Sequence, residues 1–172
     1  MPKVTFVQKA QKDYPDHGIA KGESYYRWSL RMGRGSLLRM SKTRPRPSQL
    51  TTSEYYGTVY AAQEEVEDAL AAFADPKGIE DLVATLRSAA ETIEEAGQDC
   101  SEKRDSMEAS FSGGCPTMDL LEERSVLCES TAQEVNQAAD DIEALDLDEY
   151  KNNEEDLVQE VQSIVDGIGW DL

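Results

Sequence analysis

The first 43 residues show the two-residue alternation of apolar and polar side chains that is typical of β-strands. Residues 4–7 form a short segment of this kind, and residues 24–32 form a longer one that is rich in aromatic side chains. Gly33 to Gly35 predict a turn, after which residues 36–40 return as a partner strand. In the longer segment one face holds Tyr26, Trp28, Leu30 and Met32, and the other holds Tyr25, Arg27, Ser29 and Arg31. The pattern predicts a β-hairpin or three-stranded sheet with an apolar and a basic face.

A short proline-rich segment interrupts this alternation. Pro45 and Pro47 alternate with arginine, and proline removes an amide donor while favouring an extended backbone. Residues 44–50 therefore predict a stiff joint that follows a basic β-rich module at residues 1–43.

From residue 51 onward the apolar positions recur at steps of three and four, as they do along one face of an α-helix. Thr51 and Glu54 fit a capping box at the start of the first run, and Asp75-Pro76 predicts the start of the second. The runs predict four helices, at about residues 52–74, 76–111, 117–145 and 153–167. The sequence thus predicts a mostly helical α+β protein, with the small sheet followed by a helical bundle at 51–168.

The second and third predicted helices share the a/d spacing of a coiled coil. Because only a Gly-Gly-Cys-Pro break separates them, we expect an antiparallel hairpin. The predicted stripes are Ile79, Leu82, Leu86, Ala89, Ile93, Ala96, Cys100, Met107 and Phe111 on one helix, and Met118, Leu121, Ser125, Cys128, Ala132, Val135, Ala139 and Ile142 on the other. Several members are small, so we expect a thin core that a homo-oligomer completes.

Charge divides the chain unevenly. Residues 1–50 hold 11 basic and 3 acidic side chains, a net charge of +8, whereas the other 122 residues hold 6 basic and 32 acidic ones, a net charge of −26. Such asymmetry points to binding partners rather than to a fold. No apolar run resembles a signal peptide or approaches 18 residues, so we expect a cytoplasmic protein that does not bind membranes.

The basic residues of the predicted hairpin alternate with aromatic ones, a composition typical of surfaces that bind nucleic acids. The same side chains are equally suited to pairing with the acidic helices of this chain or of a second copy. The candidate residues for nucleic-acid or acidic-partner binding are Tyr25, Arg27, Arg31, Arg34, Arg39, Lys42, Arg44 and Arg46.

Acidic residues cluster on all four predicted helices, and the last cluster comprises Glu154, Glu155, Asp156 and Glu160. Carboxylates three or four positions apart on a helix lie about 5–6 Å from one another, which is comparable to the phosphate spacing of DNA. Such a surface either remains solvated or occupies the nucleic-acid site of a basic partner protein, as a DNA mimic does. The candidate residues are Glu64, Glu65, Glu67, Asp68, Glu91, Glu94, Glu95, Asp140, Asp141 and Glu143.

The sequence offers little for catalysis or metal binding. The three cysteines lack close ligand spacing, and two of them lie on the apolar stripes, where we expect them to pack as small hydrophobic residues. Asp146, Asp148 and Glu149 lack the glycine and distal glutamate of a calcium loop. The single histidine, His17, has no accompanying nucleophile motif. We therefore expect a protein that is not an enzyme and uses no cofactor or metal.

Residues 21–28, Lys-Gly-Glu-Ser-Tyr-Tyr-Arg-Trp, and 41–51, Ser-Lys-Thr-Arg-Pro-Arg-Pro-Ser-Gln-Leu-Thr, resemble a group of small proteins from tailed bacteriophages. In that group a basic aromatic hairpin and a proline-rich joint precede acidic helices. The resemblance covers about the first 55 residues and includes no catalytic motif. It implies a phage origin and a location in the cytoplasm of a bacterial host.

These patterns favour a phage-encoded interaction protein that uses its acidic helices to inhibit a host nucleic-acid-binding protein, such as a component of host defence. Two alternatives stay open at this point. The basic hairpin is also suited to binding nucleic acid directly, and the opposite charges of the two segments are suited to joining copies in a virion or an assembly intermediate.

Overall fold

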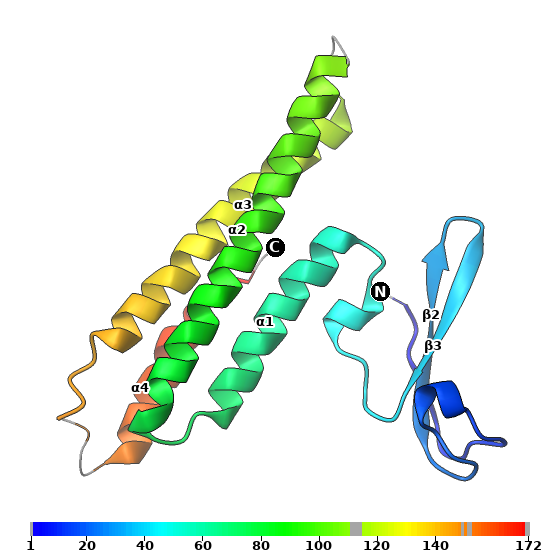
Figure 1. The fold of residues 1–172 in the computed structure, drawn as a ribbon, viewed down its shortest axis with the longest axis horizontal. Coiled ribbons are helices and arrows are strands. Elements are labelled where there is room, and N and C mark those ends of the chain that lie inside the picture. Colours follow the sequence, from blue (N-terminus) through cyan, green and yellow to red (C-terminus); the bar gives the residue numbers. More distant parts are fainter. Residues whose placement is uncertain (1, 111–114, 149, 151–152, 171–172) are drawn as a thin grey trace. The chain divides into compact units, whose positions relative to one another are not determined.

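A computed structural model of the chain describes residues 2–110, 115–148, 150 and 153–170 (Figure 1). It confirms the predicted fold class, because a three-stranded antiparallel sheet precedes four helices. The elements are β1 (Thr5–Val7), β2 (Tyr25–Met32), β3 (Gly35–Ser41), α1 (Glu54–Ala72), α2 (Ile79–Ser110), α3 (Pro116–Glu143) and α4 (Glu154–Asp166).

The chain divides into two compact units, residues 1–60 and 61–172. The division falls inside α1, so the segment that the sequence assigns to a joint at 44–50 lies within the first unit. Phe111 and residues 112–114 of the predicted break lie outside the described residues, as does Glu149.

The sheet has the order β1-β2-β3, and both strand pairs are antiparallel. A two-residue turn, Gly33-Arg34, joins β2 to β3, as predicted. Gly33 adopts a φ of 56°, which glycine tolerates because it has no Cβ. A positive φ at the first central residue matches the tight turn that best suits the twist of a hairpin.

One face of the sheet is covered within the first unit. Trp28 and Leu30 are buried on this face, as the alternation predicts, but Met32 at the end of β2 is 58% exposed. The indole Nε1 of Trp28 donates to the carbonyl oxygen of Gln49 at 3.1 Å. Gln49 belongs to a short 3₁₀ helix, Pro47–Leu50. The end of the predicted joint is therefore held against the sheet.

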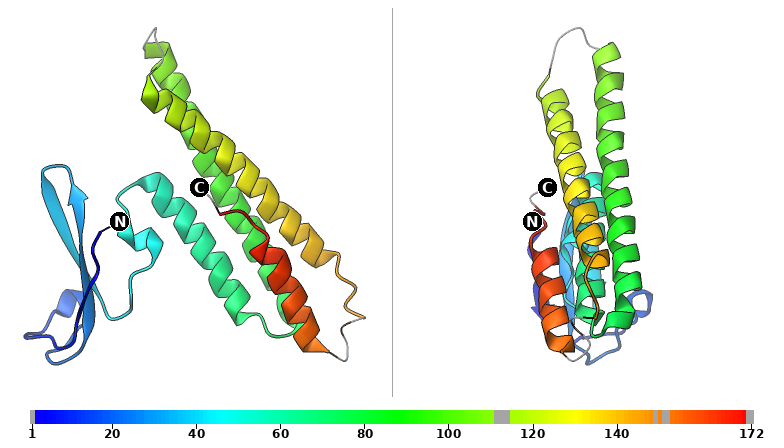
Figure 2. Two further views of the ribbon diagram at one scale, coloured as in Figure 1. Left: turned by 180° about the vertical axis from the view of Figure 1, so that it is seen from behind. Right: turned by 90° about the vertical axis from the view of Figure 1, so that its left-hand side faces the viewer.

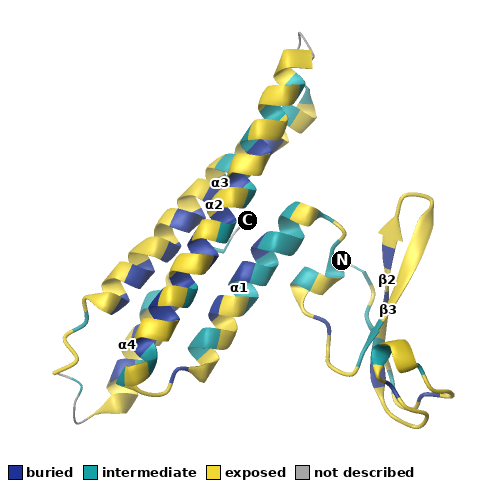
Figure 3. Cartoon of the chain, in the orientation of Figure 1, coloured by how far each residue is buried: buried dark blue, intermediate teal, exposed yellow. Residues whose placement is uncertain are grey.

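The second unit is built around α2 and α3, which run antiparallel side by side in all three views (Figures 1 and 2). Their buried positions follow one stripe along each helix (Figure 3). The stripes comprise Ile79, Leu82, Val83, Leu86, Ala89, Ala90, Ile93, Gly97 and Cys100 on α2, and Leu121, Cys128, Thr131, Ala132, Val135, Ala138, Ala139 and Ile142 on α3. The predicted antiparallel pairing is confirmed.

Gly97 brings α2 and α3 into close approach. A Cβ added to Gly97 would lie 2.7 Å from the Cβ of Cys128 and 3.4 Å from the carbonyl oxygen of Ser125. The buried member of the stripe is thus Gly97, whereas the predicted member, Ala96, is half-buried. The predicted position is therefore off by one residue. Because Gly97 has no side chain, α3 packs directly on the backbone of α2 at this point.

The helix α4 completes the second unit. α4 buries Leu157, Val161 and Val165, and Ile168 follows as a fourth buried residue. The turn after α4 is fixed to α3, because the Gly169 amide donates to the Glu134 carboxylate at 2.8 Å. These contacts make α4 part of the same core.

The starts of the helices show one confirmed prediction and one error. The Asp75 carboxylate accepts the Lys77 amide at 2.8 Å ahead of α2, and Pro76 occupies the first turn, as predicted. At α1 the capping hydroxyl belongs to Ser53, which accepts the Tyr56 amide at 3.5 Å. The predicted Thr51–Glu54 box is wrong, because α1 begins at Glu54 and Thr51 instead bonds the Ser53 amide.

In the part of the chain that the structure describes, no helix combines the length and the apolar character that a membrane span requires.

We predict that Gly97→Ala destabilises the protein by about 1–3 kcal/mol, since the new methyl group overpacks the contact with Cys128. Alanine is intrinsically about 1 kcal/mol more favourable than glycine inside a helix. The free-energy cost of the steric overlap with Cys128 therefore has to exceed this gain in helix propensity. Urea denaturation followed by circular dichroism measures the change.

The matched control is Gly57→Ala in the first turns of α1. A Cβ there meets only the Thr51 methyl, at 3.9 Å, and we expect unchanged or slightly raised stability. If Gly97→Ala behaves like Gly57→Ala, close packing at Gly97 does not limit the approach of the helices.

Candidate functional site

The predicted basic residues of the hairpin do not share one face of the sheet. Arg27 and Arg31 point to one face, and Arg39 stands directly opposite Trp28 on the other. Arg34 lies in the turn between the strands. The expected single basic face is therefore wrong: because β2 and β3 pair with Trp28 opposite Arg39, their arginines are divided between both faces.

Tyr25 is buried rather than available to a ligand. It is 5% exposed and packs with Ala10 and Ile19, which cover the face opposite Trp28. Its hydrogen bond with Tyr14, followed by burial, raises the pKa of the Tyr25 hydroxyl. This residue contributes to the small core of the first unit.

The remaining candidate cations lie beyond β3. Lys42 pairs with Glu23 at 2.9 Å, and the Ala20 amide and then Lys42 lower the pKa of the Glu23 carboxylate. Arg44 and Arg46 are exposed on the extended segment before the 3₁₀ helix. Among the described residues, none forms a hydrogen bond or ion pair with the side chain of Arg31, Arg34 or Arg39.

The candidate acidic residues fall on α1, α2 and α3, and nearly all are exposed. Asp140 and Glu143 of α3 both pair with Arg87 of α2, the former at 3.2 Å. Asp140 and then Glu143 raise the pKa of the Arg87 guanidinium. Part of the predicted surface is thus neutralised across the hairpin.

Glu91, Glu94 and Glu95 form no ion pair in the described structure, although Arg87 precedes Glu91 by one helical turn. All three are exposed on α2. The Glu94 carboxylate accepts a hydrogen bond from the side-chain amide of Gln98, at 3.4 Å. The candidates on α1 are less uniform, since Glu64 is half-buried whereas Glu65, Glu67 and Asp68 are exposed.

The hairpin of α2 and α3 carries charge at high density. The two helices hold 17 acidic and 4 basic side chains, a net charge of −13. At 1.5 Å per residue α2 is about 48 Å long, so the hairpin carries one net charge per about 4 Å. A single DNA strand carries one per about 3.4 Å and a duplex one per about 1.7 Å.

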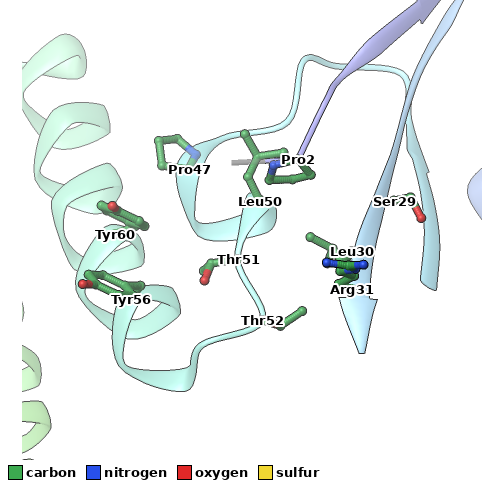
Figure 4. A pocket seen from close by; sticks show the side chains of 10 residues that line it. All are labelled: Pro2, Ser29, Leu30, Arg31, Pro47, Leu50, Thr51, Thr52, Tyr56 and Tyr60. Atoms are coloured by element: carbon green, nitrogen blue, oxygen red, sulfur yellow. The ribbon is translucent and has the colours of Figure 1, made fainter. Parts of the chain in front are cut away.

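An open cavity of about 500 Å³ lies within the first unit (Figure 4). Apolar, hydroxyl-bearing and aromatic side chains line it together with a single cation, Arg31. The lining residues are Pro2, Ser29, Leu30, Arg31, Pro47, Leu50, Thr51, Thr52, Tyr56 and Tyr60. No local sequence pattern predicts this cavity, because its walls come from three segments that only the tertiary fold brings together.

The cysteines take the structural positions that the stripes predict. Cys100 and Cys128 are buried, and burial raises the pKa of the Cys100 thiol. His17 ends a short 3₁₀ turn, Pro15–His17. Within the described residues, no three potential metal-ligating side chains come together.

Comparison with models of known protein families, with curated proteins and with solved structures gives no match for this chain.

We predict that Arg87→Gln lowers the thermal midpoint of unfolding at low salt, because it removes the cation shared by Asp140 and Glu143. The loss should shrink as salt screens the ion pairs. Differential scanning calorimetry at low and high sodium chloride checks this.

Lys77→Gln removes the same charge from an exposed position and serves as the control. Equal midpoints for the two variants at low salt would show that Arg87 acts only through net charge.

Proposed function

We propose that this protein is a non-catalytic binding protein whose acidic helical unit docks onto the nucleic-acid-binding surface of a basic partner protein. The observation that carries the proposal is the uncompensated charge of this unit. Residues 61–172 hold 31 acidic and 6 basic side chains, a net charge of −25.

The existing cations relieve this charge at only a few points. Arg87 bridges the two long helices at one level, and Arg104 lies 3.7 Å from Glu122 at another. Glu91 and Glu95, four residues apart between these levels, repel each other. Repulsion among these carboxylates destabilises the folded unit. A cationic partner relieves the repulsion when it binds, and this relief makes the binding free energy more favourable.

The size of the charge supports a partner that ordinarily binds nucleic acid. One net charge per about 4 Å along the hairpin approaches the density of one DNA strand. The resemblance of the first 55 residues to tailed-phage proteins makes a protein of a bacterial host the expected target, and inhibition the expected consequence.

A second candidate function is direct binding of nucleic acid by the sheet. Arg31, Arg34 and Arg39 favour it, because all three are exposed and no described residue forms an ion pair with their guanidinium groups. Their division between the turn and both faces of the sheet counts against a single continuous contact surface.

The test is capture from a nuclease-treated bacterial lysate on the immobilised full-length protein. We expect to capture basic DNA-binding proteins, and we expect added duplex DNA to release them because it competes for the same surface. The triple variant Glu91→Gln/Glu94→Gln/Glu95→Gln should reduce capture at least about tenfold, as loss of several charge contacts does. Its thermal midpoint should rise, since the repulsion between Glu91 and Glu95 is gone.

A matched control is the triple variant Asp99→Asn/Glu102→Gln/Glu108→Gln on the same helix. It changes the net charge equally but lies where Lys103 and Arg104 already supply cations. Equal loss of capture by the two triple variants would show a general charge effect without a defined surface. Captured proteins that duplex DNA does not release would contradict the proposed mimicry.

A further inference from the structure

β2 extends well beyond the strand that pairs with it on one side. β1 pairs only with Tyr25 to Arg27, whereas β2 continues to Met32. The same register would place Lys3 opposite Ser29 and Pro2 opposite Leu30. However, residues 2–4 are not part of the strand, and proline has no amide hydrogen with which to extend it.

The cavity of the first unit lies along this open edge. Three consecutive residues of β2 line it, Ser29 to Arg31, whereas a cavity over one face of a sheet would meet only alternate residues. The opposite edge of these residues is paired with β3, and no residue of β3 lines the cavity. Pro2, on the β1 side, does line it.

The wall facing the strand edge comes from the segment that leads into α1 (Figure 4). It contains Leu50 and Pro47 of the 3₁₀ helix and the stacked rings of Tyr56 and Tyr60, whose centroids are 5.9 Å apart. The hydrogen bond from Trp28 to Gln49 fixes this wall to β2. A strand edge and a helix start thus enclose a groove whose volume is within the range of ligand pockets.

We propose that this groove binds an extended, acidic peptide segment of a partner protein, which adds to the edge of β2 as a fourth strand. An open strand edge presents backbone donors and acceptors in the pattern that another strand satisfies. The charge of the first unit selects an acidic segment, since residues 1–60 hold 11 basic and 4 acidic side chains. Arg31 is the cation in the groove, and no described residue forms an ion pair with its side chain.

The probe is a capped seven-residue peptide in which valine and aspartate alternate, titrated against the full-length protein by fluorescence anisotropy. We expect saturable binding, together with slower hydrogen exchange at the Ser29 and Arg31 amides, which point to the open edge because the amides of Trp28, Leu30 and Met32 are bonded to β3. Arg31→Ala should weaken binding by up to about fivefold, the range of an exposed ion pair. Arg34→Ala removes the same charge from the turn and should leave the affinity within twofold.

Two N-methylated peptides test the strand pairing without altering the protein. One carries methyl groups on the first, third and fifth amides and the other on the second, fourth and sixth, so that only one set blocks the bonds to β2. We expect one peptide to lose at least about tenfold in affinity and the other to bind normally, since several backbone hydrogen bonds are lost together.

Three results would overturn the proposal. Equal affinity of the two methylated peptides would exclude strand addition. Tighter binding of an oligodeoxythymidine, with protection of the Ser29 and Arg31 amides, would assign the groove to nucleic acid. Slow exchange of these two amides in the protein alone would show that the edge is already paired.

Discussion

The close approach of α2 and α3 at Gly97 is the contact on which the helical unit depends. With no side chain at Gly97, the Cys128 side chain packs against the backbone of α2, and the small residues on both stripes keep the helices close along their length. This packing has to outweigh repulsion, because the outward surfaces of the same helices carry a net charge of −13. Arg87 reduces the repulsion locally, where it joins α2 to two carboxylates of α3.

The stability of the first unit depends on the segments that cover the two faces of its sheet. Three strands are close to the lower limit of a stable sheet, so both faces rely on cover from neighbouring segments. Trp28 is tied to Gln49 on one face, and Tyr25 packs with Ala10 and Ile19 on the other. Because β1 pairs with only three residues of β2, the cover leaves part of one strand edge open.

Local patterns in the sequence were sufficient for most of the fold. Alternation predicted β2 and β3, and steps of three and four predicted the helices and the burial of Cys100 and Cys128. The same spacing does not distinguish two adjacent small residues, so it predicts a buried Ala96 where Gly97 is the buried residue.

Features set by tertiary contacts were beyond these patterns. Tyr25 looked like part of an exposed surface because its cover comes from residues up to 15 positions earlier in the chain. The division of the arginines depends on the β2–β3 register, which spacing alone did not settle. The groove depends on the residue at which β1 begins. Pro2, just before this strand, is the residue of the sequence that indicates that the pairing does not extend further.

The surplus negative charge of the helical unit underlies both its internal strain and its proposed role in binding. The most direct test is the thermal midpoint of the full-length protein, followed by far-ultraviolet circular dichroism, as sodium chloride is raised from low to physiological concentration and beyond. Screening of uncompensated carboxylates predicts a midpoint that rises steadily with salt. A midpoint that stays constant or falls would show that the carboxylates are already compensated within the chain, and would contradict the proposed binding surface.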